Sequence, residues 1–170
     1  MSQYSKVLAL ALGMDEQRAE LLRQAAPMHD VGKIGIPDAI LLKPGKLTSE
    51  EFDHMKEHAT IGAQILANSS SPLLQLAHTL AIEHHEKWDG SGYPNGIKGE
   101  EISVEGRIVA IADVFDALTS KRPYKEAWSV EKTVLHMQEQ AGTHFDPALI
   151  ELLVKNLDNI IAIKNANQES

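Results

Sequence analysis

Apolar positions recur every three or four residues along most of this chain, which is the spacing of amphipathic helices. No stretch alternates polar and β-branched residues as a half-buried strand does, and no internal repeat is visible. One stripe runs through Leu73, Leu76, Ala77 and Leu80, and the next step of four residues reaches His84. We therefore predict an all-α fold in which His84 lies on a buried helix face.

Several short polar residues stand where helices should begin. They are Asp15, Thr48, Ser71, Ser129 and Asp146. Thr48 is followed three residues later by Glu51, which predicts a capping box and a helix running through His58. Pro27 marks a kink or a restart, and residues 32–38 (G-K-I-G-I-P-D) predict a turn-rich link.

The segment 108–118 is apolar at every position but two, which predicts a helix that is buried on most sides. The exceptions are Asp113 and Asp116, which are three residues apart and so share one face. An ionised carboxylate in such surroundings is costly to desolvate. We expect these two to meet a metal, a cation or hydrogen-bond donors, and Asp113 paired with Arg107 is one such alternative.

Composition narrows the class of protein. A length of 170 residues suits one domain, which we place at residues 1–163, followed by a polar and irregular tail at 164–170. No apolar run is long enough to span a membrane and no signal peptide is visible, so we expect a soluble, cytoplasmic chain. The net charge of -8 argues against binding to DNA or RNA polymers.

The chain has no cysteine, so a metal would be held by imidazole and carboxylate groups. That donor set favours iron, manganese, nickel or zinc. The candidate ligands come from separate segments: His29, Asp30, His58, His84, His85 and Asp113. Six ligands exceed the usual four of one structural zinc and suit two metals that share a carboxylate. Any one histidine alone is as well explained by packing, as we expect for His54, His78, His136 and His144, which lack ligand-like neighbours.

Four motifs in this order resemble the HD-GYP branch of the HD superfamily of metal-dependent phosphohydrolases. They are H-D-V-G-K at 29–33, H-A-T-I-G at 58–62, H-H-E-K-W-D-G-S-G-Y-P at 84–94 and I-A-D-V-F-D-A-L-T-S-K-R-P-Y-K at 111–125. The resemblance covers nearly the whole chain. It implies an HD-domain helical bundle that acts as a phosphodiesterase on cyclic di-GMP, giving pGpG and in some members GMP.

The resemblance also implies roles for individual residues. Asp30 would bridge two divalent ions, most often iron or manganese, with one ion completed by His58, His84 and His85 and the other by His29 and Asp113. Lys33, Arg122 and Lys125 would bind phosphate, although a solvated turn explains Arg122 and Lys125 as well. Tyr93 and Pro94 would line the pocket, where Tyr93 either stacks on guanine or simply packs. Asp116 or Lys33 would orient water or protonate the leaving oxygen.

One departure from the family pattern bears on activity. Members usually carry a Glu and a His upstream of the segment that begins this chain, so we expect either a piece of a longer protein or a reduced metal site. A second hypothesis is therefore a weakly active or inactive module that binds cyclic di-GMP or a GGDEF-domain partner. A nucleotidase for another phosphoester is a third. The family also suggests an upstream receiver or sensory domain and a homodimer.

Overall fold

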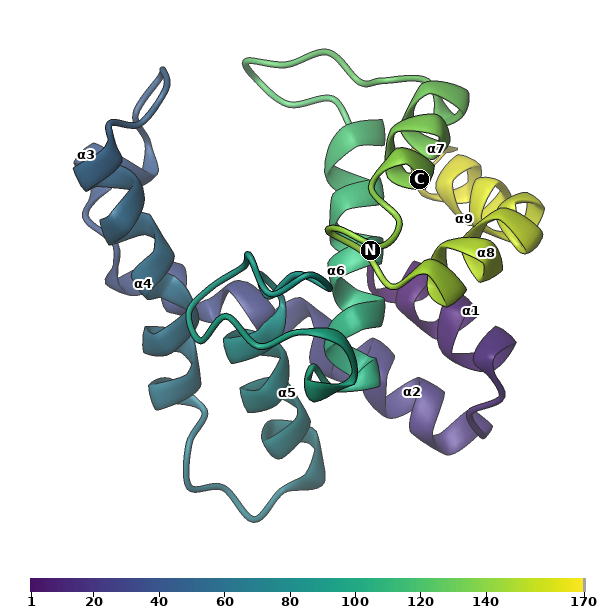
Figure 1. The fold of residues 1–170 in the computed structure, drawn as a ribbon, viewed down its shortest axis with the longest axis horizontal. Coiled ribbons are helices and arrows are strands. Elements are labelled where there is room, and N and C mark those ends of the chain that lie inside the picture. The colour runs from purple at the N-terminus through teal and green to yellow at the C-terminus, as the bar shows by residue number, and fades with distance from the viewer. Residues whose placement is uncertain (170) are drawn as a thin grey trace.

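The computed structural model describes residues 1–169, which fold into helices joined by loops (Figure 1). In chain order the elements are α1 (Ser2–Leu12), α2 (Glu16–Ala25), the 3-10 helix η1 (Ala26–Gly35), α3 (Asp38–Leu41), α4 (Ser49–Ile65), α5 (Pro72–Glu83), the 3-10 helix η2 (Gly99–Glu101), α6 (Val104–Thr119), α7 (Val130–Glu139), α8 (Pro147–Lys155) and α9 (Leu157–Glu169). Two isolated bridges are the only β-type pairings within residues 1–169. The predicted all-α, single-domain fold is confirmed.

Helices begin where the capping residues predict. Asp15, Ser71, Ser129 and Asp146 each accept a hydrogen bond from a backbone N–H two or three residues further on. At α4 the capping box is complete: the Glu51 N–H donates to the Thr48 hydroxyl at 3.1 Å, and the Thr48 N–H donates to the Glu51 carboxylate at 2.8 Å. The capping box fixes where α4 begins and therefore the position of His58 in this helix.

The core is built around α6, which contacts α1, α5, α7 and α8 and lies at the centre of Figure 1. Four of its apolar side chains, Ile108, Val109, Ile111 and Phe115, are fully buried. The ring of Tyr4 on α1 meets the Phe115 ring edge-on at 5.3 Å. The predicted buried helix is thus confirmed, and its two carboxylates lie where the core opens to solvent, with Asp113 34% and Asp116 33% exposed.

A close backbone contact joins η1 to α4. A Cβ at Gly32 would lie 1.8 Å from the carbonyl oxygen of His58, and a Cβ at Gly62 would lie 3.2 Å from the backbone nitrogen of Gly32. Two glycines therefore let η1 lie directly against α4. This packing brings the segment that carries His29 and Asp30 beside the imidazole of His58.

Residues 32–35, which we predicted as part of a turn-rich link, instead continue the 3-10 helix η1. Pro27 lies in the first turn of η1, where its missing N–H costs no hydrogen bond. The prediction was wrong for these residues because η1 is held by tertiary contacts with α4 and α5, which glycine-rich local sequence does not reveal.

The polar segment after Ile163 also differs from the expected irregular tail. Residues 164–169 continue α9, and Ser170 lies outside the described residues. Lys, Ala, Gln and Glu favour helix, and the buried Ile160 anchors the helix to the core. No helix in the described chain combines the length and the apolar character that a membrane crossing requires.

Candidate metal centre

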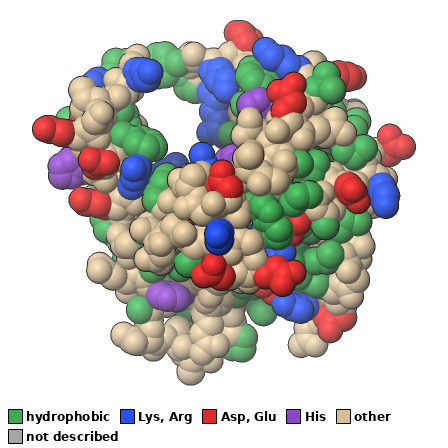
Figure 2. Space-filling view, viewed as in Figure 1, with side chains coloured by type: hydrophobic (Ala, Val, Ile, Leu, Met, Phe, Trp, Pro, Cys, Tyr) green, Lys and Arg blue, Asp and Glu red, His purple; other side chains and the backbone are tan. Residues whose placement is uncertain are grey.

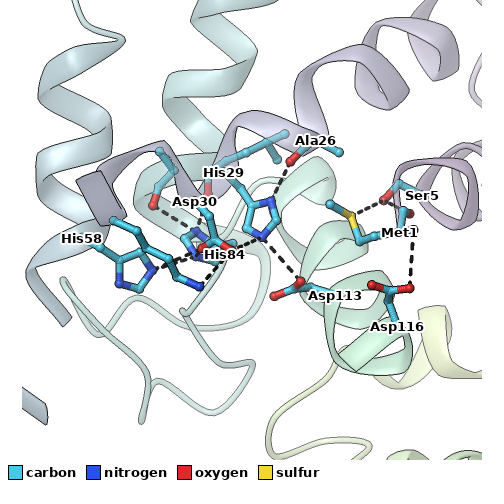
Figure 3. A network of polar contacts seen from close by, with 12 residues as sticks. Met1, Ser5, Ala26, His29, Asp30, His58, His84, Asp113 and Asp116 are labelled. Carbon is cyan, nitrogen blue, oxygen red and sulfur yellow. Dashed lines mark hydrogen bonds and ion pairs between the residues drawn. The ribbon is translucent and has the colours of Figure 1, made fainter. Parts of the chain in front are cut away.

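Histidines and carboxylates from four segments converge where η1, α4 and α5 meet α6 (Figure 3). One ligand atom each from Asp30, His58, His84 and His85 lies within 4.8 Å of the others. Asp30 follows His29 on η1, His58 lies on α4, and His84 and His85 end and follow α5. In Figure 3 Asp113 reaches the same cluster from α6. The structure thus brings all six predicted ligands together.

Asp30 lies between two sets of ligands. Its Oδ1 is 3.5 Å from Nε2 of His58 and 3.4 Å from Nε2 of His84. Its Oδ2 is 3.2 Å from Nε2 of His29, which is also 3.4 Å from Oδ1 of Asp113. A carboxylate whose two oxygens face different ligand sets has the geometry to bridge two cations.

Backbone carbonyls fix the orientation of three imidazoles. Nδ1 of His29 bonds the carbonyl oxygen of Ala26 at 2.6 Å, and Nδ1 of His58 bonds that of Met55 at 2.6 Å. Nδ1 of His84 bonds the carbonyl of Leu80 at 2.9 Å. A carbonyl only accepts, so each Nδ1 carries a proton and Nε2 is the ring nitrogen left to bind a metal. This is the arrangement in which proteins hold metal-binding histidines.

The Nε2 atoms of these three rings lie close to one another or to the carboxylates. Nε2 of His58 and Nε2 of His84 are 3.2 Å apart, a contact that brings two lone pairs together when both rings are neutral and protonated at Nδ1. Nε2 of His29 is buried and, within the described chain, has no hydrogen-bond partner of suitable angle despite the nearby carboxylates. Divalent cations bound at Nε2, in place of any proton there, would satisfy these nitrogens, so the residues present fit a metal site.

The charges of the cluster also favour a cation. Burial opposes a charged imidazole, but the carboxylates of Asp113 and Asp30 outweigh it and raise the pKa of His29 to about 10. Burial would raise the pKa of Asp30, yet the neighbouring His29 and His84 hold it far below its usual value. The polypeptide alone therefore stabilises positive charge beside Asp30.

Burial keeps His58 and His85 neutral, which is the form that binds metal. Burial lowers the pKa of His58. Burial, followed by the neighbouring His84 and His58, lowers the pKa of His85 to about 3.

Of the three predicted phosphate-binding cations, Lys33 contacts the cluster. Nζ of Lys33 is 3.2 Å from Oδ2 of Asp30, at the edge of the cluster. Arg122 and Lys125 instead lie in the exposed loop between α6 and α7, paired through their backbones at 2.9 and 3.1 Å. That loop projects beyond the helices in Figure 1, and Figure 2 shows Lys and Arg side chains around a gap on this face. No contact in the described chain joins Arg122 or Lys125 to the cluster.

Asp116 lies one turn beyond Asp113 and points toward α1 (Figure 3). Its Oδ1 is 3.8 Å from the α-amino group of Met1 and 3.5 Å from the Ser120 hydroxyl, which donates to it. No contact within residues 1–169 links it to the six ligands, so its catalytic role stays a prediction.

Tyr93 and Pro94 are half-buried beside the cluster. The Tyr93 ring stacks on the His85 ring with centroids 4.9 Å apart and planes inclined by 22°. Burial and the nearby Asp30 raise the pKa of Tyr93 to about 12, so its hydroxyl stays protonated.

The four other histidines and Arg107 are not part of the cluster. His54, His78, His136 and His144 lie outside the ligand group. Arg107 pairs with Asp146 at 2.7 Å rather than with Asp113.

Sequence reasoning missed the roles of Glu86 and Gly32. Glu86 is 2% exposed, and its carboxylate accepts the backbone N–H groups of Asn95 and Gly96 at 3.1 and 2.8 Å. The signal for both was their position inside the motifs, where we assigned them no function.

Comparison with known proteins agrees with this geometry. The family model described as HD domain matches residues 1–149. The chain is 51% identical over 148 residues to a cyclic di-GMP phosphodiesterase from Thermotoga maritima, a match that covers 87% of this chain and 40% of the relative. It is 49% identical over 161 residues to the 3'3'-cGAMP-specific phosphodiesterase 2 of Vibrio cholerae, covering 95% of this chain and 31% of the relative. The chain therefore spans less than half the length of these relatives.

Among solved structures, Bd1817, an HDG"Y"P protein from Bdellovibrio bacteriovorus, superposes with a TM-score of 0.71 at 21% identity, covering 92% of this chain and 50% of that one. This likeness shows the fold. The match over residues 1–149 and the relatives at about 50% identity show that the chain belongs to the HD domain family, and the order of its four motifs is that of the HD-GYP branch.

Proposed function

We propose that this domain hydrolyses a cyclic dinucleotide with two metal ions, cyclic di-GMP being the first substrate to test. The single observation that carries the proposal is the position of Asp30, whose oxygens face His58 and His84 on one side and His29 on the other. The names of the relatives support this substrate class and extend it to 3'3'-cGAMP. The products would be the linear dinucleotide, pGpG, and with a second cleavage GMP.

The ligand sets divide between two positions. Asp30 Oδ1 with His58, His84 and His85 would hold one ion, and Asp30 Oδ2 with His29 and Asp113 the other. When bound, two such ions activate water for attack on phosphorus and stabilise the charge that develops on the phosphate. The donors suit iron or manganese, and nickel or zinc are the alternatives.

The remaining predicted residues would act on the substrate directly. Lys33 is close enough to Asp30 to neutralise a phosphate oxygen bound at the cluster. Arg122 and Lys125 would close onto the second phosphate from their exposed loop, with the arginine binding through two parallel hydrogen bonds. Tyr93 and Pro94 would form the pocket wall. Asp116 or Lys33 would orient water or protonate the leaving oxygen.

A second candidate function is a signalling module that binds the dinucleotide or a GGDEF-domain partner but hydrolyses slowly. The observation that favours it is the smaller ligand set around His29, whose Nε2 has the carboxylates of Asp30 and Asp113 as its neighbouring acidic groups within residues 1–169. For either function, we infer that the domain acts in the cytoplasm and is regulated by an upstream receiver or sensory domain. A homodimer is the assembly to test.

The test combines metal content with product analysis. The chain is reconstituted with Fe²⁺ or Mn²⁺ without oxygen and given cyclic di-GMP, 3'3'-cGAMP and mononucleotide controls, and products are separated by chromatography. Asp30→Ala and His84→Ala should each lower turnover at least about a hundredfold. Mutating a residue that only orients a metal ligand costs about 10- to 100-fold, and loss of the ligand itself should cost more. His54→Ala, an exposed histidine outside the cluster, is the control.

Turnover at the original rate by Asp30→Ala would overturn the mechanism. Dinucleotide binding with less than one ion per chain and no linear product would instead favour the binding module.

A further inference from the structure

His85 differs from the other histidines of the cluster in what holds its ring. His29, His58 and His84 each bond a backbone carbonyl through Nδ1. The ring of His85 makes no hydrogen bond to any group in residues 1–169. Ring contacts surround it instead: Tyr93 is stacked on it at 4.9 Å, and His58 meets it edge-on at 4.9 Å.

We propose that Tyr93 is a positioning residue that holds the imidazole of His85 toward Asp30 and so strengthens one of the two metal positions. This inference rests on the proposed function, since it assumes that the cluster binds metal. Stacking restrains the plane of the imidazole, as a hydrogen bond restrains the other three rings. The role is separate from any contact that Tyr93 makes with substrate.

The loop that carries Tyr93 is folded back onto His85 and tied there. The Tyr93 N–H donates to the His85 carbonyl oxygen at 3.3 Å. A Cβ at Gly92 would lie 2.4 Å from the same oxygen, so only glycine permits this approach. Just after Tyr93 in the chain, the N–H groups of Asn95 and Gly96 donate to the buried carboxylate of Glu86. The residue after His85 thus anchors the loop that covers His85.

Helix α4 supports the tyrosine ring from another direction. Phe52 meets the Tyr93 ring edge-on with centroids 6.2 Å apart, and Nζ of Lys56 lies over the Tyr93 ring at 5.5 Å. Protein groups therefore already occupy much of the ring surface. Because His58 lies on the same helix, α4 fixes both a ligand and the ring that supports a second ligand.

The experiment measures metal binding rather than turnover. The full chain is stripped with a chelator and titrated with Co²⁺, whose visible absorption reports each ligand set. Wild type should bind two ions. Tyr93→Leu should weaken one of them about 10- to 100-fold and leave the other, held by His29 and Asp113, unchanged. Tyr93→Phe keeps the stack and should bind as wild type does. Tyr124→Leu removes a tyrosine that is 82% exposed and is the matched control.

Each outcome decides between named alternatives. Equal Co²⁺ affinities in wild type and Tyr93→Leu would overturn the inference, and an accompanying rise in KM for the dinucleotide would make Tyr93 a substrate contact only. Wild type that binds no metal would overturn the proposed function as well. Should Tyr93→Leu fail to fold, Glu86→Gln decides, because releasing the loop should weaken the same ion while an unchanged affinity would count against the inference.

Discussion

The backbone of Gly32 lies against the carbonyl of His58 so closely that a Cβ at Gly32 would be 1.8 Å from that oxygen. The contact joins the segment that carries Asp30 to the helix that carries a second ligand. Ligand geometry therefore depends on a residue that offers no donor atom of its own.

Gly32→Ala should separate η1 from α4 and disrupt both the fold and the metal cluster. We expect the free energy of unfolding to fall by more than about 3 kcal/mol, because the clash is with backbone rather than with a flexible side chain. Urea unfolding measures the loss. Gly45→Ala is the control, since a Cβ there meets no atom within 4 Å. Equal stability of the two variants would contradict the contact.

Metal stoichiometry should separate the ligands by position. Asp113→Ala and His85→Ala should each lose one of two ions, whereas Asp30→Ala should lose both or bind them weakly, because its oxygens face both ligand sets. Elemental analysis of dialysed protein gives the counts. If Asp30→Ala lost a single ion, Asp30 would not be a bridge.

The ion pair between Arg107 and Asp146 should contribute to stability more than surface pairs do. The two side chains are 16% and 8% exposed and 2.7 Å apart, so removing one leaves a buried charge. Arg107→Met should lower the free energy of unfolding by about 3 kcal/mol. Glu16→Gln, which breaks an exposed pair with Lys6, should change it by less than about 1 kcal/mol. Similar losses in both variants would show that burial does not govern these pairs.

His144 should make the domain less stable in acid. Burial, then Lys87 and His136, lowers the pKa of His144 to about 4, against the opposing effect of Asp89. Between that value and the ordinary histidine pKa of about 6.5, the unfolded chain binds more protons than the folded one, so stability falls as pH falls. His144→Gln should show a shallower loss of stability over this range in chelator-treated protein. An unchanged slope would mean that His144 titrates normally.

Local features of the sequence predicted what depends on local chemistry. The capping residues at Asp15, Thr48 and Asp146 start helices because a side-chain oxygen within three residues satisfies a free N–H. The helix containing Asp113 could be predicted as mostly buried because segment 108–118 is apolar at every position but Asp113 and Asp116. The six candidate ligands were predicted from the histidines and carboxylates of separate segments, and the structure brings those residues together.

Other features depend on contacts between distant segments and had no local signal. The 3-10 helix η1 exists because Gly32 permits contact with α4, and the stacking of Tyr93 on His85 needs the loop anchored by Glu86. The position of Arg122 is a further case. Its loop is exposed and pairs mainly with itself, so neither sequence nor fold determines how it meets a substrate.

The most direct test of the central claim is anomalous X-ray diffraction at the metal absorption edges from crystals grown with Mn²⁺ or Fe²⁺. The account predicts two peaks about 3.5 to 4 Å apart on either side of the Asp30 carboxylate, one beside His58, His84 and His85 and the other beside His29 and Asp113. A single peak that leaves His29 and Asp113 without a metal, or no peak at all, would contradict it.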